Sequence, residues 1–352
     1  MDANKIGQAI AFLRKRAGYT QKDLADRIGI SDKAISKWER GLGLPDIAYL
    51  RKLSILLDTD TDSLLDGDVV HHDPGWQGVV VLDDNGYGIG ASTLIYDKPL
   101  VEFILSYFLL VGIRNIAISC SKEDKEYIRK KTEDGRSFGI ELSFSTSGIK
   151  NLRLSNEKST MIVYGRCFLY GVDQTRFFQK AMINKDRLTL LALPKKNTTD
   201  TEQIRMDINK KVVNASDSEQ NDVQALNTQY DYCGIPILFC PPQLIQSILN
   251  SGDVGEFLNA YRERHDLHVE MLDRGFVEIE VDSWNDVQET SSFLRIVQQK
   301  CGMNVYCLAE VAWRRGMISA EMLKAQGEKY SGTEYGEYIL SLYQRVKSRQ
   351  IE

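Results

Sequence analysis

Residues 20–41, TQKDLADRIGISDKAISKWERG, predict two short helices joined by a tight turn. Thr20 is a favourable N-cap for the first helix, expected over residues 20–27, and Gly29 can take the left-handed conformation that ends a helix. Ser31 is placed to cap the second helix. Apolar residues recur at helical spacing and are expected to form the buried faces of the two helices: Leu24, Ala25, Ile28, Ala34, Ile35 and Trp38.

The opposite face of the second helix is polar and basic. It carries Asp32, Lys33, Ser36, Lys37 and Arg40. A helix that buries one side and presents short polar and basic groups on the other suits the major groove of DNA, where such groups reach base edges. The alternative interpretation is a solvated face with no ligand. Helix spacing alone leaves both interpretations open.

The pattern continues beyond this stretch. The segments QKDLADRIGIS, ISKWERG, LRKLSILL and TDSLL resemble the run from the second to the fifth helix of the Cro/C1 (Xre) repressor family. The resemblance implies a small all-α five-helix helix-turn-helix domain over residues 1–66, in which Arg14 pairs with Glu39. It also implies these DNA-binding residues: Gln21, Ser31, Asp32, Lys33, Ser36, Lys37 and Arg40. Asp32 departs from the family pattern, since its carboxylate either repels phosphate or accepts a hydrogen bond from cytosine, and the sequence does not predict its base.

The totals allow a second, larger domain. The 352 residues are 43% hydrophobic and 26% charged, the composition of an ordinary soluble protein, and exclude a disordered or membrane class. The net charge is −5, and residues 1–66 carry 11 basic against 10 acidic residues. DNA binding would therefore rest on a local basic face, which favours a specific regulator over a nonspecific condenser.

Targeting and redox features are those of a cytoplasmic protein. The N-terminal residues MDANKIGQAI are polar and helical, so we expect no signal peptide, and the apolar run 103–113 is too short to span a bilayer. The six cysteines include no CxxC pair and are expected to be buried and reduced. HDLH at residues 265–268 has no second cluster beside it, and we expect no metal site.

The chain after residue 66 follows another pattern. Residues 67–75 have the polar, Gly/Pro character of a linker. Strands are expected at 78–82, 115–120 and 140–145, alternating with helices at 99–111, which is amphipathic, and 121–131. This alternation predicts a doubly wound α/β sheet. Further expected segments are central strands at 161–164, 188–193 and 234–239, an irregular excursion at 205–228 and helices over 293–346.

Several motifs in this region resemble the glucose-1-phosphate thymidylyltransferase family. They are YDKP at 96–99, VGIRNIAISCSKED at 111–124, FGIELSFS at 138–145 and GMNVYCLAEVAWRRGMISAEML at 302–323. The resemblance covers about residues 78–346. It implies an α/β Rossmann-like nucleotidyltransferase domain over residues 76–352, with a helical C-terminal region that takes part in subunit contacts and in a regulatory nucleotide site near Glu310. The alternative for Glu310 is that it caps and packs a helix.

The charged groups that the family uses for its chemistry are largely missing. The enzymes join a sugar 1-phosphate to a nucleoside triphosphate with Mg²⁺, which requires cations on the phosphates and carboxylates on the metal. DDNGYGIGAST at 83–93 is shorter than the family's glycine-rich loop, has lost its arginine and lysine, and begins with two acids. Arg166 stands where the family has a metal-binding aspartate, and a guanidinium has no lone pair for Mg²⁺. The second metal carboxylate is left open between Glu280 and Asp282.

These substitutions predict no catalytic residues, no metal site and no cofactor, with Mg²⁺ required only if the transferase site is active. A smaller ligand site remains a hypothesis. Its candidate residues are Gly86, Gly88, Lys98, Arg166, Gly234, Glu280, Asp282 and Glu310.

Three functions stay open. The first is a sequence-specific, DNA-binding transcriptional regulator with a catalytically degenerate sensor or dimerisation domain. It would bind double-stranded DNA as a homodimer or higher homo-oligomer and answer to a nucleotide or sugar-nucleotide effector. The alternative is an active sugar-1-phosphate nucleotidyltransferase that carries a DNA-binding domain. The third is a scaffold that binds neither.

Overall fold

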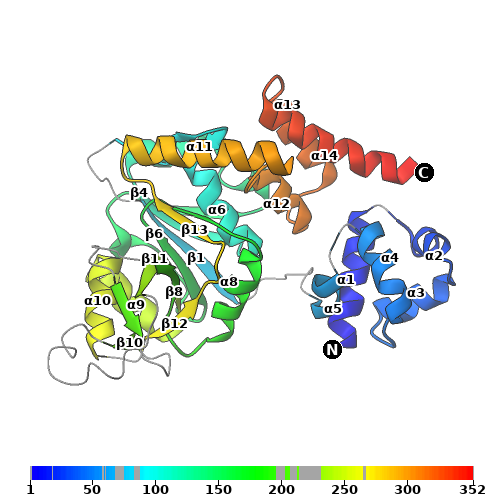
Figure 1. The fold of residues 1–352 in the computed structure, drawn as a ribbon, viewed down its shortest axis with the longest axis horizontal. Coiled ribbons are helices and arrows are strands. Elements are labelled where there is room, and N and C mark those ends of the chain that lie inside the picture. The colour runs from blue at the N-terminus through cyan, green and yellow to red at the C-terminus, as the bar shows by residue number, and fades with distance from the viewer. Residues whose placement is uncertain are drawn as a thin grey trace. The chain divides into compact units, whose positions relative to one another are not determined.

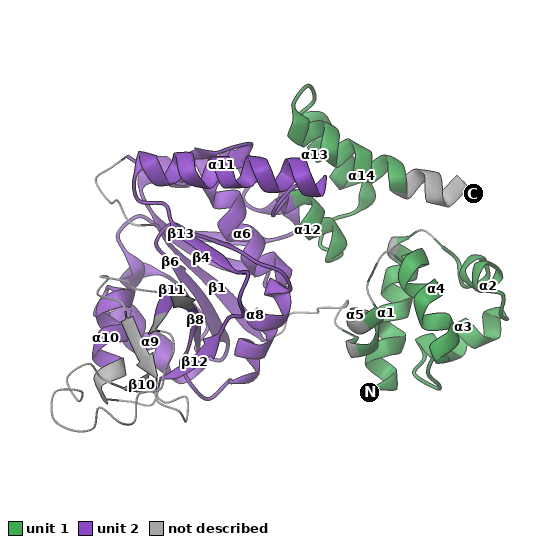
Figure 2. Ribbon diagram, in the orientation of Figure 1, with its two compact units in different colours: residues 1–72, 309–352 green, residues 73–308 purple. Residues whose placement is uncertain are grey.

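The computed structural model describes residues 2–17, 19–57, 59, 61–67, 75–82, 88–195, 203–206, 212–213, 231–264 and 267–351. The chain divides into two compact units, residues 1–72 with 309–352 and residues 73–308 (Figure 2). The domain boundaries inferred from sequence, at residues 66 and 76, stay predictions.

The N-terminal part of the first unit is helical, as the sequence predicts. Its helices are α1 (Ala3–Arg16), α2 (Gln21–Ile28), α3 (Asp32–Glu39), α4 (Ile47–Leu57) and α5 (Thr61–Asp66) (Figure 1). Thr20 and Asp23 form a reciprocal capping box at the start of α2, and Gly29 ends that helix with φ 86°. The Ser31 hydroxyl accepts the Ala34 N–H at 3.3 Å and starts α3. The three predicted helix boundaries are therefore confirmed.

One apolar core holds these five helices together. Burial of each large side chain contributes roughly 1.5–3 kcal/mol. The buried members are Ile6, Ile10, Leu13, Tyr19, Leu24, Ala25, Ile28, Ile35, Trp38, Leu50, Leu53, Leu57 and Leu64. Ala34 is only half-buried, so the inward face of α3 is formed by Ile35 and Trp38. The core fixes which side of α3 faces outward.

The C-terminal segment of the chain forms α12 (Leu308–Arg314), α13 (Ala320–Lys329) and α14 (Glu334–Ile351). Ser319 caps α13 through the Met322 N–H at 3.2 Å. The rings of Tyr330 and Tyr335 meet edge to face, with centroids 5.4 Å apart, at the turn between α13 and α14. The helical C-terminal region predicted from sequence is confirmed.

The second unit is built on a mixed sheet with the order β10-β9-β11-β6-β1-β4-β5, extended by β8 beside β11 and β12 beside β8. β4, β5 and β6 run parallel to β1, whereas β11 is antiparallel to β6 and β8. The strands are β1 (Trp76–Leu82), β4 (Asn115–Cys120), β5 (Glu141–Ser145), β6 (Ser159–Tyr164), β8 (Thr189–Lys195), β9 (Gln203–Met206), β10 (Val212–Val213), β11 (Asp231–Cys240) and β12 (His268–Met271).

Two small ribbons and the helices complete this unit. The ribbons pair β2 (Leu94–Ile95) with β3 (Lys98–Pro99), and β7 (Cys167–Tyr170) with β13 (Val277–Glu280). The helices are α6 (Leu100–Leu110), α7 (Lys122–Thr132), η1 (Arg136–Phe138), η2 (Ile149–Asn151), α8 (Gln174–Ile183), α9 (Pro242–Ser251), α10 (Val254–Arg264) and α11 (Trp284–Cys301). The predicted strands and helices are present. β10 and part of β9 lie within the stretch expected to be irregular, most of which falls outside the described residues.

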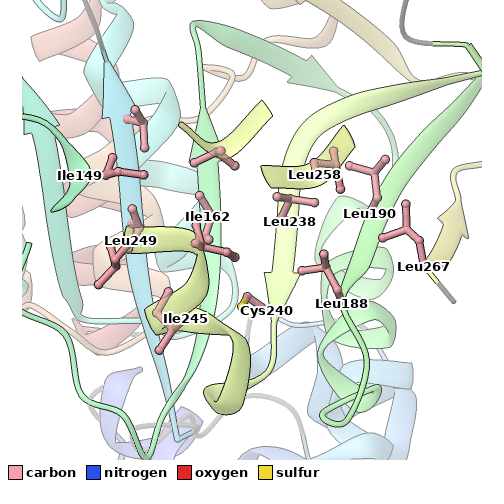
Figure 3. Close-up of a cluster of buried hydrophobic side chains, with 14 of the residues drawn as sticks. Ile149, Ile162, Leu188, Leu190, Leu238, Cys240, Ile245, Leu249, Leu258 and Leu267 are labelled. Atoms are coloured by element: carbon pink, nitrogen blue, oxygen red, sulfur yellow. The ribbon is translucent and has the colours of Figure 1, made fainter. Parts of the chain in front are cut away.

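The apolar interior of this unit differs from the predicted pattern at α6. The sequence predicts an amphipathic helix there, but α6 is buried on all sides and only Leu110 is half-buried. The Ser106 hydroxyl donates to the Glu102 carbonyl at 2.7 Å, so this polar group is satisfied inside the core. Figure 3 shows a further cluster, in which Ile245 and Leu249 of α9 and Leu258 of α10 meet sheet residues such as Ile162 and Leu238.

The order in which the strands are added to the sheet reverses around β1. The path from β1 leads to β4 and β5 on one side, and β6 lies on the other side. In open α/β sheets, ligands bind beyond the carboxyl ends of the strands at such a reversal. The segments that follow β1, β4 and β6 are therefore the place to look for a site.

The structure also bears on the cysteines, on membrane-spanning helices and on metal sites. Burial raises the pKa of the Cys240 thiol to about 12, and four other cysteines are also buried. The expectation that all six are buried is wrong, because Cys301 is exposed at the end of α11. Within the described ranges, no helix is long and apolar enough to cross a membrane, and no group of three or more His, Cys, Asp or Glu side chains could hold a metal ion.

Candidate functional site

The outward face of α3 gathers the basic residues that the sequence singled out. Lys33, Lys37 and Arg40 are exposed, and Ser36 is half-buried between them. Asp32, also exposed, accepts the Lys33 N–H on its Oδ1 at 2.8 Å. α3 therefore has one apolar and one basic side, as a helix that lies in a groove requires.

A charged network fixes the position of α3. Arg14 of α1 donates from Nε and Nη2 to the two oxygens of Glu39, at 2.5 and 3.0 Å, and from Nη1 to the Tyr19 carbonyl at 2.7 Å. The side chains of Arg14 and Glu39 are 9% and 7% exposed. This bidentate pair, expected from the family resemblance, ties the end of α3 to α1 and to the segment before α2.

Gln21 is part of the same network, which the sequence did not indicate. Its Nε2 donates to Oε2 of Glu39 at 2.7 Å, and the side chain is half-buried. One of its two amide N–H groups is therefore used inside the protein, and the second is the donor left for the predicted DNA contact. Glu39 holds α1, α2 and α3 in one arrangement.

Arg40 also has an internal contact. Its Nε donates to the Ser36 carbonyl at 3.2 Å, which folds the side chain back along α3. The Nη groups of the guanidinium stay exposed at the end of the helix. Such a group suits a phosphate better than a base edge, because phosphate contacts position a protein at the walls of the groove.

The second site lies at the carboxyl edge of the sheet, where the segment after β1 is described from Gly88 onward. Three consecutive residues there are bound by the chain itself. The Ile89 carbonyl accepts Arg166 Nε at 2.6 Å, the Gly90 N–H donates to Thr93 Oγ1 at 3.0 Å, and the Ala91 N–H donates to Asp124 Oδ1 at 2.7 Å. Two backbone donors that a phosphate would need are thus already occupied.

Asp124 was not recognised from the sequence. It is a buried residue in the first turn of α7, where its N–H donates to the Ser121 cap. A Cβ on Gly90 would lie 2.6 Å from its Oδ1, so only glycine allows the carboxylate to approach. A periodicity search could not reveal this contact, because Asp124 reads as an ordinary acidic residue at a helix start.

Arg166 connects the segment after β1 to Asp282. It follows β6, is 4% exposed, and its Nη1 lies 3.7 Å from Oδ1 of the half-exposed Asp282. Glu280 ends β13 opposite Cys167, close to Gly165. The structure therefore brings together three of the predicted residues, namely Arg166, Glu280 and Asp282.

These residues do not fit a magnesium ion. A divalent cation needs oxygen ligands with free lone pairs, whereas a guanidinium is a permanent cation without one. Arg166 supplies that cation within 4 Å of Asp282, and its Nε is fixed on the Ile89 carbonyl. A metal beside Asp282 would be repelled by Arg166, so this group of residues does not suit metal-dependent chemistry.

The remaining predicted ligand residues have other surroundings. Lys98 is 1% exposed, and its Nζ donates to Asp97 Oδ1 at 2.7 Å and to Gln298 Oε1 at 3.3 Å. Gly234 lies inside β11 opposite Ala192, where the register with β8 shifts. Through these contacts, neither Lys98 nor Gly234 joins the group formed by Arg166, Glu280 and Asp282.

Glu310 belongs to the other compact unit. Its Oε1 accepts Arg314 Nε at 2.8 Å and its Oε2 accepts the Tyr338 hydroxyl at 2.6 Å, so both oxygens join α12 to itself and to α14. Gly88 is exposed with φ 69°. Gly86, the acids at 83 and 84, and His265 lie outside the described residues.

Comparison with known proteins separates the two regions. Residues 10–64 match the helix-turn-helix family. Over 262 residues the chain is 27% identical to the glucose-1-phosphate thymidylyltransferase of Neisseria meningitidis, covering 71% of this chain and 91% of that relative. It is 23% identical over 262 residues to the enzyme of Xanthomonas campestris pv. campestris, covering 71% and 88%.

A solved structure from Bacillus anthracis, assigned to the glucose-1-phosphate thymidylyltransferases and in complex with sucrose, covers 62% of this chain and 95% of that chain. The sequence identity is 13% and the TM-score 0.46. The chain carries a helix-turn-helix region followed by a nucleotidyltransferase-like domain. Both resemblances read from the sequence are confirmed.

Proposed function

We propose that this protein is a sequence-specific DNA-binding transcriptional regulator whose nucleotidyltransferase-like domain no longer transfers nucleotides. The proposal rests on the outward face of α3, where Lys33, Lys37 and Arg40 are exposed. The Arg14–Glu39 ion pair fixes the position of this helix on its inner side. A pre-positioned helix loses little conformational entropy on binding, so its contacts contribute more fully to affinity.

The charge distribution favours sequence-specific DNA binding over nonspecific DNA binding. The whole chain carries −5, so DNA is not attracted to the protein in general. The exposed cations of α3 then supply the proposed attraction, and affinity depends on contacts within that surface. A single module of this kind usually binds weakly, and we expect a homodimer that reads two half-sites about one helical turn, or a multiple of it, apart.

The loss of transferase chemistry is supported by the self-contained charges of the second site. The Gly90 and Ala91 N–H groups are held by Thr93 and Asp124, and Arg166 occupies the side of Asp282 where a metal would be needed. Within the described residues, these two N–H groups and Asp282 are therefore not free to offset the charge that develops on the phosphates in the transition state. The domain would then serve as a dimerisation body or as the sensor of a nucleotide or sugar-nucleotide effector.

The DNA-binding half is tested by fluorescence anisotropy after a motif has been selected from random duplexes with the full chain. We expect Lys33→Ala with Lys37→Ala to abolish enrichment of the motif. The matched control removes two exposed lysines from α7, Lys122→Ala with Lys130→Ala, and should leave enrichment unchanged. Equal enrichment by both double variants would contradict the assignment of α3.

A second candidate function is favoured by the homology itself, which spans 91% of the Neisseria meningitidis enzyme. In this alternative the protein is an active sugar-1-phosphate nucleotidyltransferase that also binds DNA. Incubation with Mg²⁺, nucleoside triphosphates and glucose 1-phosphate, with pyrophosphate release as the readout, separates the two. We expect no release above a no-enzyme control, and turnover would establish the alternative.

A further inference from the structure

The exposed cations of α3 differ in what they can still donate. Within the part of the chain that the structure describes, the amino groups of Lys33 and Lys37 form no hydrogen bond or ion pair, whereas Arg40 already donates to the Ser36 carbonyl. Each free ammonium has three donors and no acceptor. Lys33 and Lys37 can therefore read only base edges that offer acceptors.

The two lysines lie on one side of the helix. They are four residues apart, so they are separated by about 40° around the axis and by about 6 Å along it. Stacked base pairs rise by roughly 3.4 Å, and this separation corresponds to about two base-pair steps along a groove that the helix follows. One helix insertion can thus bring both amino groups to bases on neighbouring steps.

Acceptor geometry selects the base. In the major groove guanine presents two adjacent acceptors, O6 and N7, which one ammonium can engage together. Adenine places a donor beside its single N7 acceptor, and thymine offers one oxygen beside a methyl group. Guanine is therefore the base that best matches an uncommitted lysine.

Asp32 gives the opposite preference at the neighbouring position. Its carboxylate is held at the start of α3 by the Lys33 N–H at 2.8 Å, and a carboxylate only accepts hydrogen bonds. Facing guanine O6 and N7, it would meet acceptors, which costs affinity. Facing the amino group of cytosine or adenine, it would gain a bond. Asp32 thus disfavours guanine at the base it faces, whereas Lys33 and Lys37 favour guanine at theirs.

We infer that the half-site bound by this protein carries two guanines about two base-pair steps apart, one read by Lys33 and the other by Lys37. This inference rests on the proposed DNA-binding function. Arg40 contributes affinity through phosphate and no base preference, because its Nε is fixed on its own helix. The guanines can stand on either strand, since the major groove exposes both.

Gly43 positions the second lysine. A Cβ at Gly43 would lie 3.3 Å from Lys37 Cε and 3.7 Å from its Cδ, so the lysine stem runs along the turn that follows α3. An alanine there would displace the stem by a few tenths of an ångström. Gly43→Ala should therefore weaken the preference for the Lys37 guanine and leave the Lys33 guanine unchanged. This makes it a variant that perturbs one lysine without removing any charge.

The experiment selects duplexes from a random pool with the full chain, the two single variants Lys33→Ala and Lys37→Ala, and Asp32→Asn. We expect two guanines in the wild-type motif, each single lysine variant to lose a different one, and Asp32→Asn to relax one non-guanine position. Each guanine is then replaced by 7-deazaguanine, which lacks N7. Each replacement should weaken wild-type binding by roughly fivefold to tenfold and leave the matching lysine variant unaffected.

The outcomes separate this inference from the function it rests on. A motif that is enriched but lacks paired guanines, or that tolerates 7-deazaguanine at both positions, would overturn the inference and leave DNA binding intact. Failure to enrich any motif would refute the proposed function itself. Because Lys33 and Lys37 are exposed, unchanged circular dichroism melts of the variants exclude misfolding as the cause.

Discussion

The helix-turn-helix region and the sheet domain use similar charged side chains in opposite ways. On α3 the cations Lys33 and Lys37 face solvent, and the buried Arg14–Glu39 pair only holds the helix. At the carboxyl edge of the sheet, Arg166 and Asp124 are buried and their charges face the chain's own backbone. A charge left to solvent is available to an external polyanion, whereas a charge paired internally must first be released. This difference is why we assign binding to one region and structural support to the other.

The largest effect is expected from breaking the buried network of the first region. Glu39→Ala leaves the Arg14 guanidinium and the Gln21 amide without their shared acceptor. Removing one partner of a buried ion pair costs about 3 kcal/mol in the free energy of unfolding. Urea unfolding followed by circular dichroism of the full chain measures the loss in its first transition.

The control for this variant is Asp26→Ala, which removes an exposed acid from α2. Its effect should stay within about 0.5 kcal/mol. A loss below about 1 kcal/mol for Glu39→Ala would mean that the pair does not organise the helices, and the contrast between the two regions would weaken.

The next effect concerns the cation of the second region. Arg166→Asp removes the donor to the Ile89 carbonyl and places a second acid near Asp282. We expect a loss of about 2 kcal/mol in the presence of a chelator. The variant now offers two neighbouring carboxylates, so Mg²⁺ should raise its melting temperature while leaving the wild type unchanged.

Arg153→Asp provides the matched charge change on an exposed position of the same unit. Its melting temperature should not respond to Mg²⁺. If wild-type protein were itself stabilised by Mg²⁺ at millimolar concentration, the claim that Arg166 has displaced the metal would fail.

A smaller effect separates affinity from specificity in the first region. Arg40→Ala should weaken binding to all duplexes alike, by about 1 kcal/mol, or roughly fivefold in Kd. The slope of log K against log salt should fall by roughly 0.9, because one phosphate contact is lost. Anisotropy titrations of the selected motif and of a scrambled duplex at several salt concentrations measure both. A change confined to the selected motif would show that Arg40 reads a base.

The smallest effect is a pH dependence at the start of α2. The Thr20 hydroxyl, followed by the Thr20 N–H, holds the pKa of Asp23 below its usual range. A lowered folded pKa stabilises the fold above the unfolded pKa near 4, and this contribution is lost as the pH falls through the folded value. Melting temperatures between pH 2.5 and 6 should fall less steeply for Asp23→Asn than for wild type. Parallel curves of melting temperature against pH would show that Asp23 does not contribute to the pH dependence. Asp26→Asn serves as the exposed control.

Local patterns in the sequence were sufficient for the helix-turn-helix region. Thr20, Gly29 and Ser31 act on the backbone within three or four residues, and the apolar period of α1 to α3 needs no distant partner. The contacts that define the second site were not accessible in this way. Ala91 and Asp124 are 33 residues apart, and no spacing rule connects a backbone N–H in a loop to an acid in the first turn of a distant helix.

Single charged residues that the sequence offers as ligand candidates also have internal partners. Lys98 resembled a ligand lysine, yet it is enclosed with Asp97 and with Gln298, which lies 200 residues away in the chain. Glu310, also a candidate residue of a ligand site, accepts a hydrogen bond that joins α12 to α14, and its role toward a ligand stays a prediction. The sequence does not distinguish a charged residue that has a distant internal partner from one that binds a ligand.

Arg166 and a bound divalent cation differ in how permanently they hold the edge of the sheet. A bound divalent ion exchanges with its surroundings and can be stripped by a chelator or by scarcity, but a guanidinium is covalently part of the chain. The tether on the Ile89 carbonyl is thus present in every copy from the moment of folding. Under the proposed function, the shape of this edge of the sheet does not depend on a bound divalent cation.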